Sequence, residues 1–410
     1  MKFCKRCLYS TDHPLGIVLD NDGICSGCRI HEEKNKLDWN FRKDKLQRLL
    51  KNYKTKKGFT CDCIVPVSGS NDSFFIMHLV KNILGLNPLM VTYNKYYNTP
   101  LGIRNLALLR STFNSDILVQ NVNPLSVKKI TKETLRRFGS IYWHCLAGKT
   151  VFPVQIAVKY KIPLIVWGAH QGIEQVGMFS HEDEVEMTRR YRKDHDLMGF
   201  EADDLIEITN NLTENDIWQY RYPDDNLLNS IGVRGIYLSN FFRWDSKSQH
   251  ELMIKKYKYK SSKFSRTFEN YDHTDCFNYM DLHDYLKLCK HGYSKVTDHA
   301  CREIRYERLT RSQGLSLVKQ YELVAPKFLD LFSEWLKIDL DSFNFIFNQF
   351  RNKKYWIEDK PSHFIFNGLS SNQLGLKFSE DKKLSISYVE NSKLFNTGER
   401  EYIIYGKGCS

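Results

Sequence analysis

The stretch CDCIVPVSGSNDSFFIMHLVKNIL, residues 61–84, decides the fold. It begins with an apolar run that ends at Val67, which is typical of a buried β-strand. Its last part places apolar residues at helical spacing from Phe74 to Leu84, and the polar segment 68–73 joins the two parts. A strand, a tight polar loop and a helix start direct backbone N–H groups and the positive end of the helix toward an anion. The stretch therefore predicts a phosphate-binding loop. The alternative is an ordinary strand-to-helix turn with Asp72 as the N-cap.

The composition indicates a folded protein. With 410 residues, 42% of them hydrophobic and 13% aromatic, the chain is long enough for two or three domains. Its longest clean apolar run, 162–168, is far too short to cross a bilayer, and the start MKFCKRC lacks the apolar stretch of a signal peptide. We therefore expect a cytoplasmic protein without membrane insertion. Eleven scattered cysteines are too few for a disulfide scaffold.

The formal charge is +12, and part of the excess lies in residues 34–57. Nucleic acid is one partner that suits a basic surface, but anionic ATP or a nucleotide sugar suits it too. The same segment has apolar residues at helical spacing, namely Leu37, Phe41, Leu46, Leu49, Leu50 and Tyr53. We therefore favour a docked helix with a solvated basic face over a nucleic-acid site.

Two cysteine pairs near the start predict a metal site. Cys4 and Cys7 form one C-x2-C pair, Cys25 and Cys28 form the other, and seventeen residues separate the pairs. Four thiolates that converge on one tetrahedral ion describe a structural zinc ribbon. About thirty residues cannot bury enough core to fold alone, so the metal would supply the stability. An iron–sulfur centre and unconnected cysteines are the alternatives.

Two further cysteines belong to the stretch that decides the fold. Cys61 and Cys63 alternate along the expected strand, so we interpret them as core or near-core thiols, with a redox role as the alternative.

The order of elements predicts an α/β fold with a doubly wound parallel sheet. We expect strands at 63–67, 88–93, 116–120 and 163–167, alternating with helices at 73–84, 100–112, 124–138 and 151–159. After residue 243 the pattern becomes mostly helical, with helices at 281–290, 298–308 and 310–321 and then a Phe-rich region. The final residues, with apolar runs at 383–389 and 401–405, predict a small β appendage.

These patterns divide the chain into five parts. We expect a zinc ribbon at 1–35, a basic linker helix at 36–57, the sheet domain at 58–242, a helical substrate or partner region at 243–322, and a helical and small β appendage at 323–410.

Polar residues gather in three places outside the loop. Segment 167–172 closes a strand with Gly168 and an imidazole, His170, that we expect to be exposed. Because ligands of parallel sheets bind beyond the carboxyl ends of the strands, this segment and the loop 68–73 are expected to line one crevice. Segment 178–192 mixes carboxylates and guanidinium groups, including His181, Glu182 and Arg189, which suits a charged sugar nucleotide. A solvated amphipathic helix is the alternative there. The third place is 281–305.

The loop resembles the Ser-Gly-Gly-x-Asp-Ser signature of the PP-loop ATP pyrophosphatases. Ser68, Gly69, Asp72 and Ser73 match it, whereas Ser70 stands where the second glycine is expected. A Cβ at that position would obstruct a positive φ or crowd a phosphate, although the hydroxyl adds a donor.

The order of the motifs is similar to that of the N-acetyl sugar amidotransferases of surface-polysaccharide and flagellin-glycan biosynthesis, including pseudaminic acid derivatives. The resemblance rests on the cysteine ribbon, the loop, the strand at 162–168, Ser180-His181 and the block 283–305, and it covers roughly residues 1–322. It implies a PP-loop, adenine nucleotide alpha hydrolase-like domain. It also implies adenylation of an acetamido carbonyl by ATP with Mg²⁺, followed by attack of ammonia to give an acetamidino sugar.

The resemblance also implies site roles. Asp72 and Ser73 would be catalytic, with Ser68, Gly69, Ser70 and Gly168 beside them at the nucleotide. His170, His181, Glu182 and Arg189 are the candidates for an acetamido sugar or nucleotide sugar acceptor.

The chain lacks a readable glutaminase nucleophile. Lys2 follows Met1, no Gly-x-Cys-x-Gly elbow is present, and adjacent residues such as His144 and Cys145 seldom point together. Ammonia would therefore come from separate glutaminase and channel subunits, as the resemblance implies.

Two other functions stay open. A PP-loop enzyme that thiolates tRNA would suit the ribbon, the loop and the basic charge, with Cys145 or Cys301 carrying sulfur. A non-catalytic nucleotide-binding assembly subunit would suit the departure at Ser70.

Overall fold

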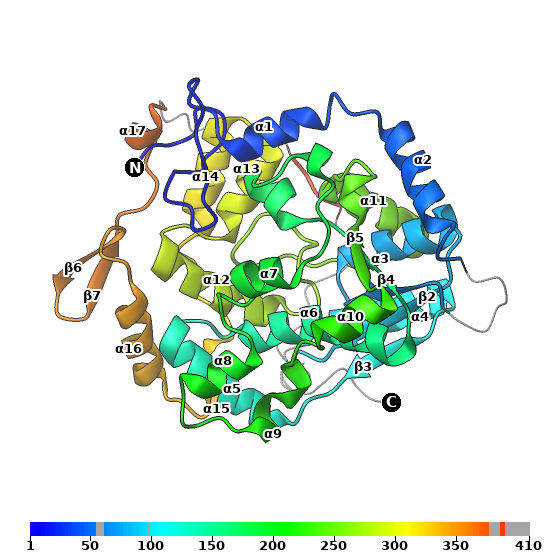
Figure 1. Cartoon of the computed structure of the whole chain (residues 1–410). Coiled ribbons are helices and arrows are strands. Elements are labelled where there is room, and N and C mark those ends of the chain that lie inside the picture. Colours follow the sequence, from blue (N-terminus) through cyan, green and yellow to red (C-terminus); the bar gives the residue numbers. More distant parts are fainter. Residues whose placement is uncertain (55–60, 97, 377–385, 390–410) are drawn as a thin grey trace.

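The computed structural model, which describes residues 1–54, 61–96, 98–376 and 386–389, is built around a five-stranded parallel sheet that lies in the right half of Figure 1. The strand order is β3-β2-β1-β4-β5. The strands span Cys63–Pro66 (β1), Pro88–Tyr93 (β2), Ile117–Gln120 (β3), Leu164–Trp167 (β4) and Arg234–Tyr237 (β5). The four predicted strands are confirmed. The fifth was not predicted, because Arg234 and Gly235 interrupt its apolar run.

Side chains of β1 alternate between two cores, as the period of two in a strand requires. Cys63 and Val65 pack on one face with helices α3 (Asn71–Met77), α4 (Pro100–Phe113) and α11 (Ser246–Tyr257). Ile64 packs on the other face against α6 (Trp143–Tyr160). Helices thus cover both faces, and the doubly wound α/β sheet is confirmed.

Strand order reverses between β1 and β4, because β2 and β3 lie on one side of β1 while β4 and β5 lie on the other. Ile64 pairs with both Leu89 and Ile165 across this point. A crevice opens beyond the carboxyl ends of the strands at such a switch point. The polar loop 68–73 follows β1 directly, so the topology places it there.

The remaining helices surround this sheet domain and build a second layer. They are α1 (Ser26–Glu33), α2 (Trp39–Leu50), α5 (Pro124–Phe138), α7 (Arg189–Tyr191), α8 (Ala202–Glu207), α9 (Glu214–Ile217), α10 (Asp225–Ile231), α12 (Phe277–His291), α13 (Lys295–Arg305), α14 (Arg311–Tyr321), α15 (Leu329–Leu336), α16 (Leu340–Phe350) and α17 (Ser371–Leu374). One apolar core joins α5 and α6 to α12, α15 and α16, so the C-terminal helices pack directly on the sheet domain. The expected helix at 73–84 is α3 followed by a π-helical turn, His78–Ile83.

The basic segment forms a docked helix, as expected. Leu46 and Leu50 of α2 are buried in the core of the sheet domain, whereas Phe41 is 59% exposed. The helix ends at Leu50, and residues 55–57 of the expected linker helix lie outside the described residues.

The N-terminal segment lies against α13 and α14, which are yellow beside the blue N-terminus in Figure 1. An antiparallel hairpin of β6 (Trp356–Lys360) and β7 (His363–Phe366) projects at the opposite end from the sheet. The expectation of a terminal β appendage at 383–389 is wrong for its described part, because residues 386–389 are not in a strand. Residues 383–385 and the run 401–405 lie outside the described residues.

Within the described ranges, no helix has both the length and the apolar character needed to cross a bilayer.

Candidate functional site

The loop 68–73 gathers three serine hydroxyls at the carboxyl end of β1. The Ser68 Oγ lies 2.8 Å from the Ser70 Oγ and 3.5 Å from the Ser73 Oγ. The backbone N–H of Ser68 donates to the Ser73 Oγ at 2.8 Å, and that of Ser70 donates to the Ser68 Oγ at 3.2 Å. The three hydroxyls sit at the start of α3, whose positive end favours an anion. The arrangement can hold a phosphate group.

Ser70 adopts an ordinary backbone conformation, with φ −98° and ψ 165°. A side chain at this position therefore requires no left-handed backbone, and one of the two objections to the missing glycine is removed. Gly69 is a different case, because a Cβ there would lie 2.1 Å from the carbonyl oxygen of Gly102. The loop thus packs against the first turn of α4 so tightly that only glycine fits.

Asp72 lies in the first turn of α3 and is not its N-cap, which is Ser70. The alternative interpretation, an ordinary turn with Asp72 as the N-cap, is therefore wrong about the N-cap. The Asp72 Oδ1 is buried and accepts no hydrogen bond from the described residues. Burial, and then the negative charge of Asp272, raise the pKa of Asp72 to about 7. A carboxylate that the fold leaves without a partner is a candidate for contact with a ligand or a cation.

A cavity of about 280 Å³, here called the loop cavity, opens over this loop. Besides the loop, it is lined by residues of β2 and β4 and of the segments that follow them, of α6, of the segment after α7 and of the segment before α12. Among them are Lys95, Lys149, Gly168, His170, Arg192 and Asp275. Lys95 pairs with Asp275 at 2.7 Å. Lys149 is exposed and forms no ion pair with a described residue, so it offers the loop cavity a positive charge.

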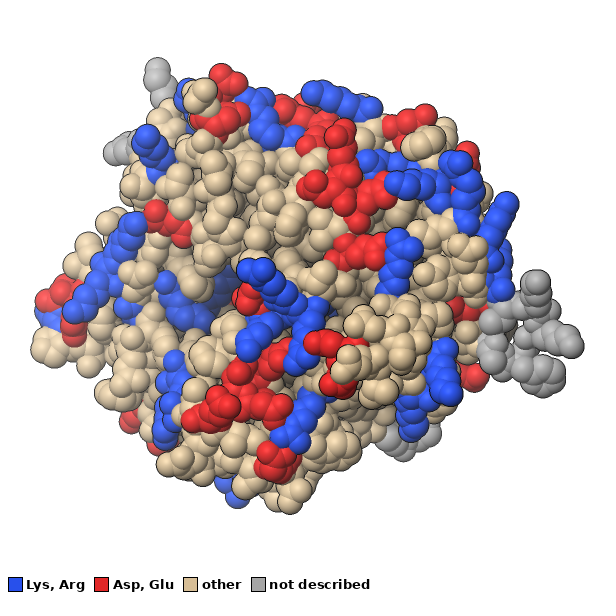
Figure 2. Space-filling view, in the orientation of Figure 1, with Lys and Arg blue, Asp and Glu red and all other residues tan. Residues whose placement is uncertain are grey.

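A second cavity of about 450 Å³, here called the polar chamber, shares a wall with the loop cavity. Asp72, Asp272 and His273 line both. The chamber is built largely from α12, α13 and the segment before them, and Lys287, Lys290, Lys295, Asp298, Arg302 and Arg305 line it. Figure 2 shows a hollow with Lys and Arg at its floor, between the positions of α12 and α7 in Figure 1. Two cavities in the size range of ligand sites thus meet at Asp72.

Charges in the polar chamber are mostly paired. Lys287 is 2.5 Å from Asp298, and Lys34 pairs with Glu174. Lys290 and Lys295 form no ion pair with described residues, and burial lowers the pKa of Lys290 to about 8. The chamber therefore suits a polar ligand that also carries negative charge.

His273 stands at the shared wall with a positive φ of 57°. For a residue with a Cβ this left-handed conformation is uncommon, and such positions cluster at functional sites. The adjacent Thr274 Oγ1 donates to the Gly69 carbonyl oxygen at 3.2 Å, which ties this segment to the loop.

Our expectation of an exposed His170 is wrong, since its side chain is 1% exposed. The rings of Tyr191 and Tyr237 cover it, each with its centroid 4.6 Å away. Neither ring nitrogen has a hydrogen-bond partner among the described residues, and burial lowers the pKa of His170 to about 4. His170 is a neutral imidazole at the wall of the loop cavity, as is Gly168.

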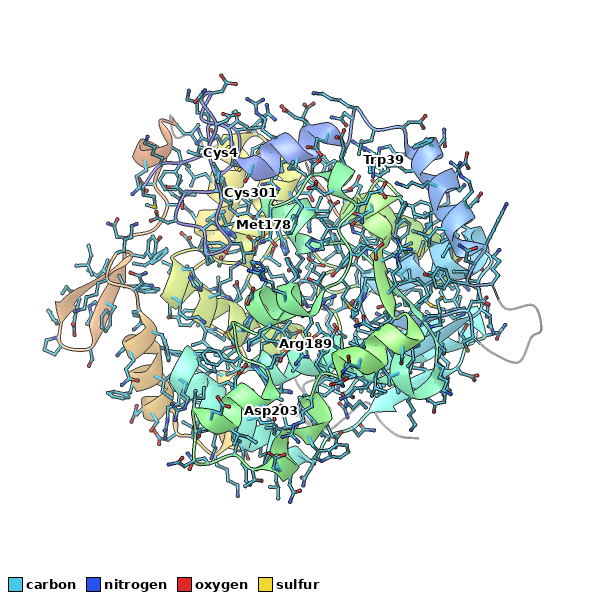
Figure 3. All side chains as sticks on the ribbon, viewed as in Figure 1. Cys4, Trp39, Met178, Arg189, Asp203 and Cys301 are labelled. Carbon is cyan, nitrogen blue, oxygen red and sulfur yellow. The ribbon has the colours of Figure 1, made fainter. Side chains whose placement is uncertain are left out.

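The other three acceptor candidates do not line either cavity. His181 is buried between two carboxylates, 3.3 Å from Glu33 and 3.7 Å from Glu174. Glu182 is exposed. Arg189 pairs with Glu201 at 2.8 Å at the surface, on α7 and well away from the labelled Cys4 (Figure 3).

Segment 178–192 is not the continuous amphipathic helix of our alternative interpretation. It contains a 3-10 turn at His181–Asp183, a stretch without regular secondary structure and then α7. The φ of Glu184 is 44°, which ends the turn.

The four N-terminal cysteines converge as expected. All are fully buried, and their ligand atoms lie within 4.8 Å of one another. The Sγ atoms of Cys4 and Cys28 are 4.0 Å apart and those of Cys7 and Cys25 are 3.6 Å apart. Zinc–sulfur bonds of about 2.3 Å in a tetrahedron give sulfur separations of about 3.8 Å. The residues therefore fit a structural metal such as zinc.

The ribbon is packed into the rest of the chain. Backbone N–H groups of Arg6, Cys7 and Cys25 point at the Cys4 Sγ at 3.2–3.4 Å. Arg305 of α13 donates to the Gln175 carbonyl at 2.7 Å, and a Cβ on Gly27 would lie 2.3 Å from its guanidinium. Tyr9, Leu15, His31 and Lys34 from this end of the chain line the polar chamber. The ribbon is thus one wall of the chamber.

Other thiols lie away from both cavities. Cys63 is fully buried, Cys61 is half-buried, and burial raises the pKa of both, which fits core thiols. His144 and Cys145 do approach each other, with the Sγ 3.5 Å from Nε2. Burial nonetheless raises the pKa of Cys145 well above its usual value and lowers that of His144 to about 3. Neither group is charged as a thiolate–imidazolium pair requires.

Cys301, the other proposed sulfur carrier, is fully buried and accepts from the Leu8 N–H at 3.4 Å. It lies beside Cys4 and Met178 (Figure 3). A thiolation site at either cavity therefore has no cysteine in its described lining.

The sequence did not single out Lys149 or Asp272 as site residues, whereas His299 belongs to the polar block 281–305 that it did single out. Lys149 follows Gly148, where an added Cβ would lie 2.2 Å from the ring of Tyr93, so a glycine before a lysine was the available local signal. Asp272 comes from a loop with no recognisable motif.

Comparison with known proteins matches one part of the chain. Residues 264–369 match a family model described as LPS biosynthesis protein WbpG-like, C-terminal domain. This segment carries α12 to α16 and most of the charged wall of the polar chamber. The match fits a protein of surface-polysaccharide biosynthesis. No curated protein matches the chain.

Proposed function

We propose that the chain is an ATP-dependent N-acetyl sugar amidotransferase of surface-glycan biosynthesis. One observation carries this proposal: the loop cavity, with three hydroxyls, Asp72 and Lys149, shares a wall at Asp72 with the polar chamber, and the WbpG-like segment lines much of that chamber. A phosphate-binding site and a site for a polar acceptor thus share a wall. An adenylyl transfer needs that adjacency, because the acceptor oxygen must reach the α-phosphorus.

In this proposal the loop binds the β- and γ-phosphates of ATP. Ser68, Ser70 and Ser73 supply hydroxyl groups, and Lys149 offsets negative charge. Mg²⁺ at ATP would neutralise the charge that develops on the leaving pyrophosphate. Asp72 is the carboxylate that lies within the phosphate-binding loop, so it is the candidate to hold this ion. Ser73 holds the loop, because its hydroxyl accepts the Ser68 N–H.

The acceptor would enter the polar chamber. Its acetamido oxygen attacks the α-phosphorus, the bond to the β-phosphate oxygen breaks, and pyrophosphate leaves. Ammonia then attacks the activated carbon and AMP leaves with the former amide oxygen, giving an acetamidino group. His170 is the acceptor candidate that lines a cavity and is retained in this proposal.

Three further parts belong to the proposal. The four cysteines bind zinc as a structural ion. The ammonia comes from separate glutaminase and channel subunits, because the high pKa of Cys145 does not suit a nucleophile. The protein works in the cytoplasm, where ATP and nucleotide sugars are made.

The test is product analysis. The purified protein is incubated with ATP, Mg²⁺, ammonium and a panel of UDP- and CMP-linked acetamido sugars, and the products are identified by mass spectrometry. We expect AMP, pyrophosphate and a sugar lighter by the exchange of oxygen for an imino nitrogen. Asp72→Ala should lower the rate by about 10²-fold or more. The matched control is Asp203→Ala, since Asp203 pairs with Arg221 at the surface away from both cavities. ADP and phosphate as products would refute the assignment.

A further inference from the structure

Two carboxylates and an imidazole converge at the wall of the polar chamber. Glu269 and Asp272 come from the segment between α11 and α12, and His299 comes from α13. One ligand atom from each lies within 4.8 Å of the others. The His299 Nε2 is 3.2 Å from the Asp272 Oδ2 and 3.8 Å from the Glu269 Oε2. Glu269 and His299 are both more than nine-tenths buried.

The fold orients these groups toward one point. The His299 Nδ1 is 2.6 Å from the Thr267 Oγ1, and when this hydroxyl accepts the Nδ1 proton, the lone pair of Nε2 faces both carboxylates. The Glu269 Oε1 accepts the Asp272 N–H at 2.7 Å, which leaves Oε2 directed at the imidazole. Metal-binding histidines are held in this way through their second nitrogen.

The cluster adjoins the phosphate-binding loop. Asp272 and Asp72 both line the wall between the two cavities. The Asp72 Oδ1 is buried without a hydrogen-bond partner among the described residues. A buried carboxylate oxygen without a partner indicates a missing cation or donor.

An ion-pair network is the competing explanation. The Arg302 guanidinium is 2.9 Å from the Glu269 Oε2 and 3.7 Å from the Asp272 Oδ2, and it also pairs with Glu303 at 3.1 Å. Glu303 also pairs with Arg308 at 2.5 Å, so Arg302 is left to serve Glu269 and Asp272. No described residue forms an ion pair with Asp72, and three carboxylates around this wall therefore face one guanidinium. A divalent cation would offset the remaining negative charge.

We infer that Glu269, Asp272 and His299 form a divalent-cation site that faces Asp72. Two carboxylate oxygens and one imidazole nitrogen suit Mn²⁺ or Mg²⁺ better than a thiophilic ion. In the proposed reaction, on which this last step rests, the ion lies between the helical region and the nucleotide phosphates. Cation binding by the protein without nucleotide does not depend on that reaction.

The experiment is Mn²⁺ titration of the full-length, zinc-loaded protein without nucleotide, followed by electron paramagnetic resonance. We expect one Mn²⁺ per chain and pulsed spectra with coupling to an imidazole nitrogen. His299→Ala should remove the nitrogen coupling and weaken binding by about 10-fold or more, and Asp272→Asn should weaken it similarly. The matched control is His363→Ala, which alters an exposed histidine beside Asp359 on the hairpin.

Each outcome decides the inference. Absence of stoichiometric Mn²⁺ binding by the unmodified protein would overturn it, even if AMP were formed from ATP. Nitrogen coupling that persisted in a folded His299→Ala protein would overturn it as well. If His299→Ala does not fold, Thr267→Val removes the orienting hydroxyl and should still reduce Mn²⁺ affinity. Mn²⁺ binding together with ADP formation would support the cation site and refute the proposed reaction.

Discussion

Replacing Ser70 with glycine restores the PP-loop signature, yet we expect it to weaken the protein and not to raise its activity. The φ of Ser70 is −98°, so glycine relieves no strain. The change removes the 2.8 Å hydrogen bond between the Ser68 and Ser70 hydroxyls, which is worth about 1 kcal/mol net. The extra freedom of glycine in the unfolded chain adds about 0.5–1 kcal/mol. The free energy of unfolding should therefore fall by about 1.5–2 kcal/mol. No capping bond is lost, because the Ser70 side chain caps no backbone N–H.

Urea unfolding and the rate of AMP formation test this reasoning together. Ser70→Ala is the control, because it keeps the Cβ and removes the hydroxyl. We expect Ser70→Ala to lose about 1 kcal/mol and Ser70→Gly to lose more, while neither exceeds the unmodified rate. A faster Ser70→Gly protein with an unchanged Ser70→Ala protein would show that the Cβ crowds a phosphate. Unchanged stability of both proteins would refute the role of the hydroxyl bond.

Three other predictions address the metal, pH and nitrogen. Elemental analysis should find one zinc per chain, lost in the Cys25→Ser, Cys28→Ser protein and retained in Cys61→Ser; equal contents would contradict the site. Burial raises the pKa of Glu322 to about 7, so its stabilising contribution is full below about pH 4 and is lost as the pH rises through 7. In Glu322→Gln the loss of unfolding free energy between pH 4 and pH 8 should be smaller by about 1–3 kcal/mol than in the unmodified protein. Identical pH profiles of the two proteins would contradict this prediction. The purified chain should form product with ammonium but not with glutamine until a separate glutaminase is added. If the purified chain alone consumed glutamine at the rate of product formation, the prediction would be wrong and Cys145 would be the candidate nucleophile.

Local sequence patterns predicted the parts of the structure that depend on neighbouring residues. The strand and loop at 63–73 follow from an apolar run and a polar turn, and the cysteine spacing follows from the geometry of one ion. The hydrophobic period also placed α2 on the core, through Leu46 and Leu50.

Features that depend on distant contacts could not be predicted. His170 ends a strand, where a polar residue is usually exposed, but Tyr191 and Tyr237 arrive from later segments and cover it. The charges of 178–192 have a helical spacing, yet His181 is held by Glu33 and Glu174 and Glu184 is left-handed. Asp272 meets Asp72 only because a segment two hundred residues later in the chain packs on the loop.

The shared core of the ribbon and α13 to α14 determines when the N-terminus can fold. Leu8 and Tyr9 are synthesised first, but the residues that bury them, such as Ala300 and Leu315, are synthesised about three hundred residues later. Contacts this distant in sequence slow folding, because a long loop must close before they form. During synthesis on the ribosome, the apolar residues around the cysteine pairs would therefore stay exposed until α14 has emerged and can pack on them. A chain cut before α13 would leave that surface exposed, and a ribbon moved to another protein would lose its contacts with α13 and α14.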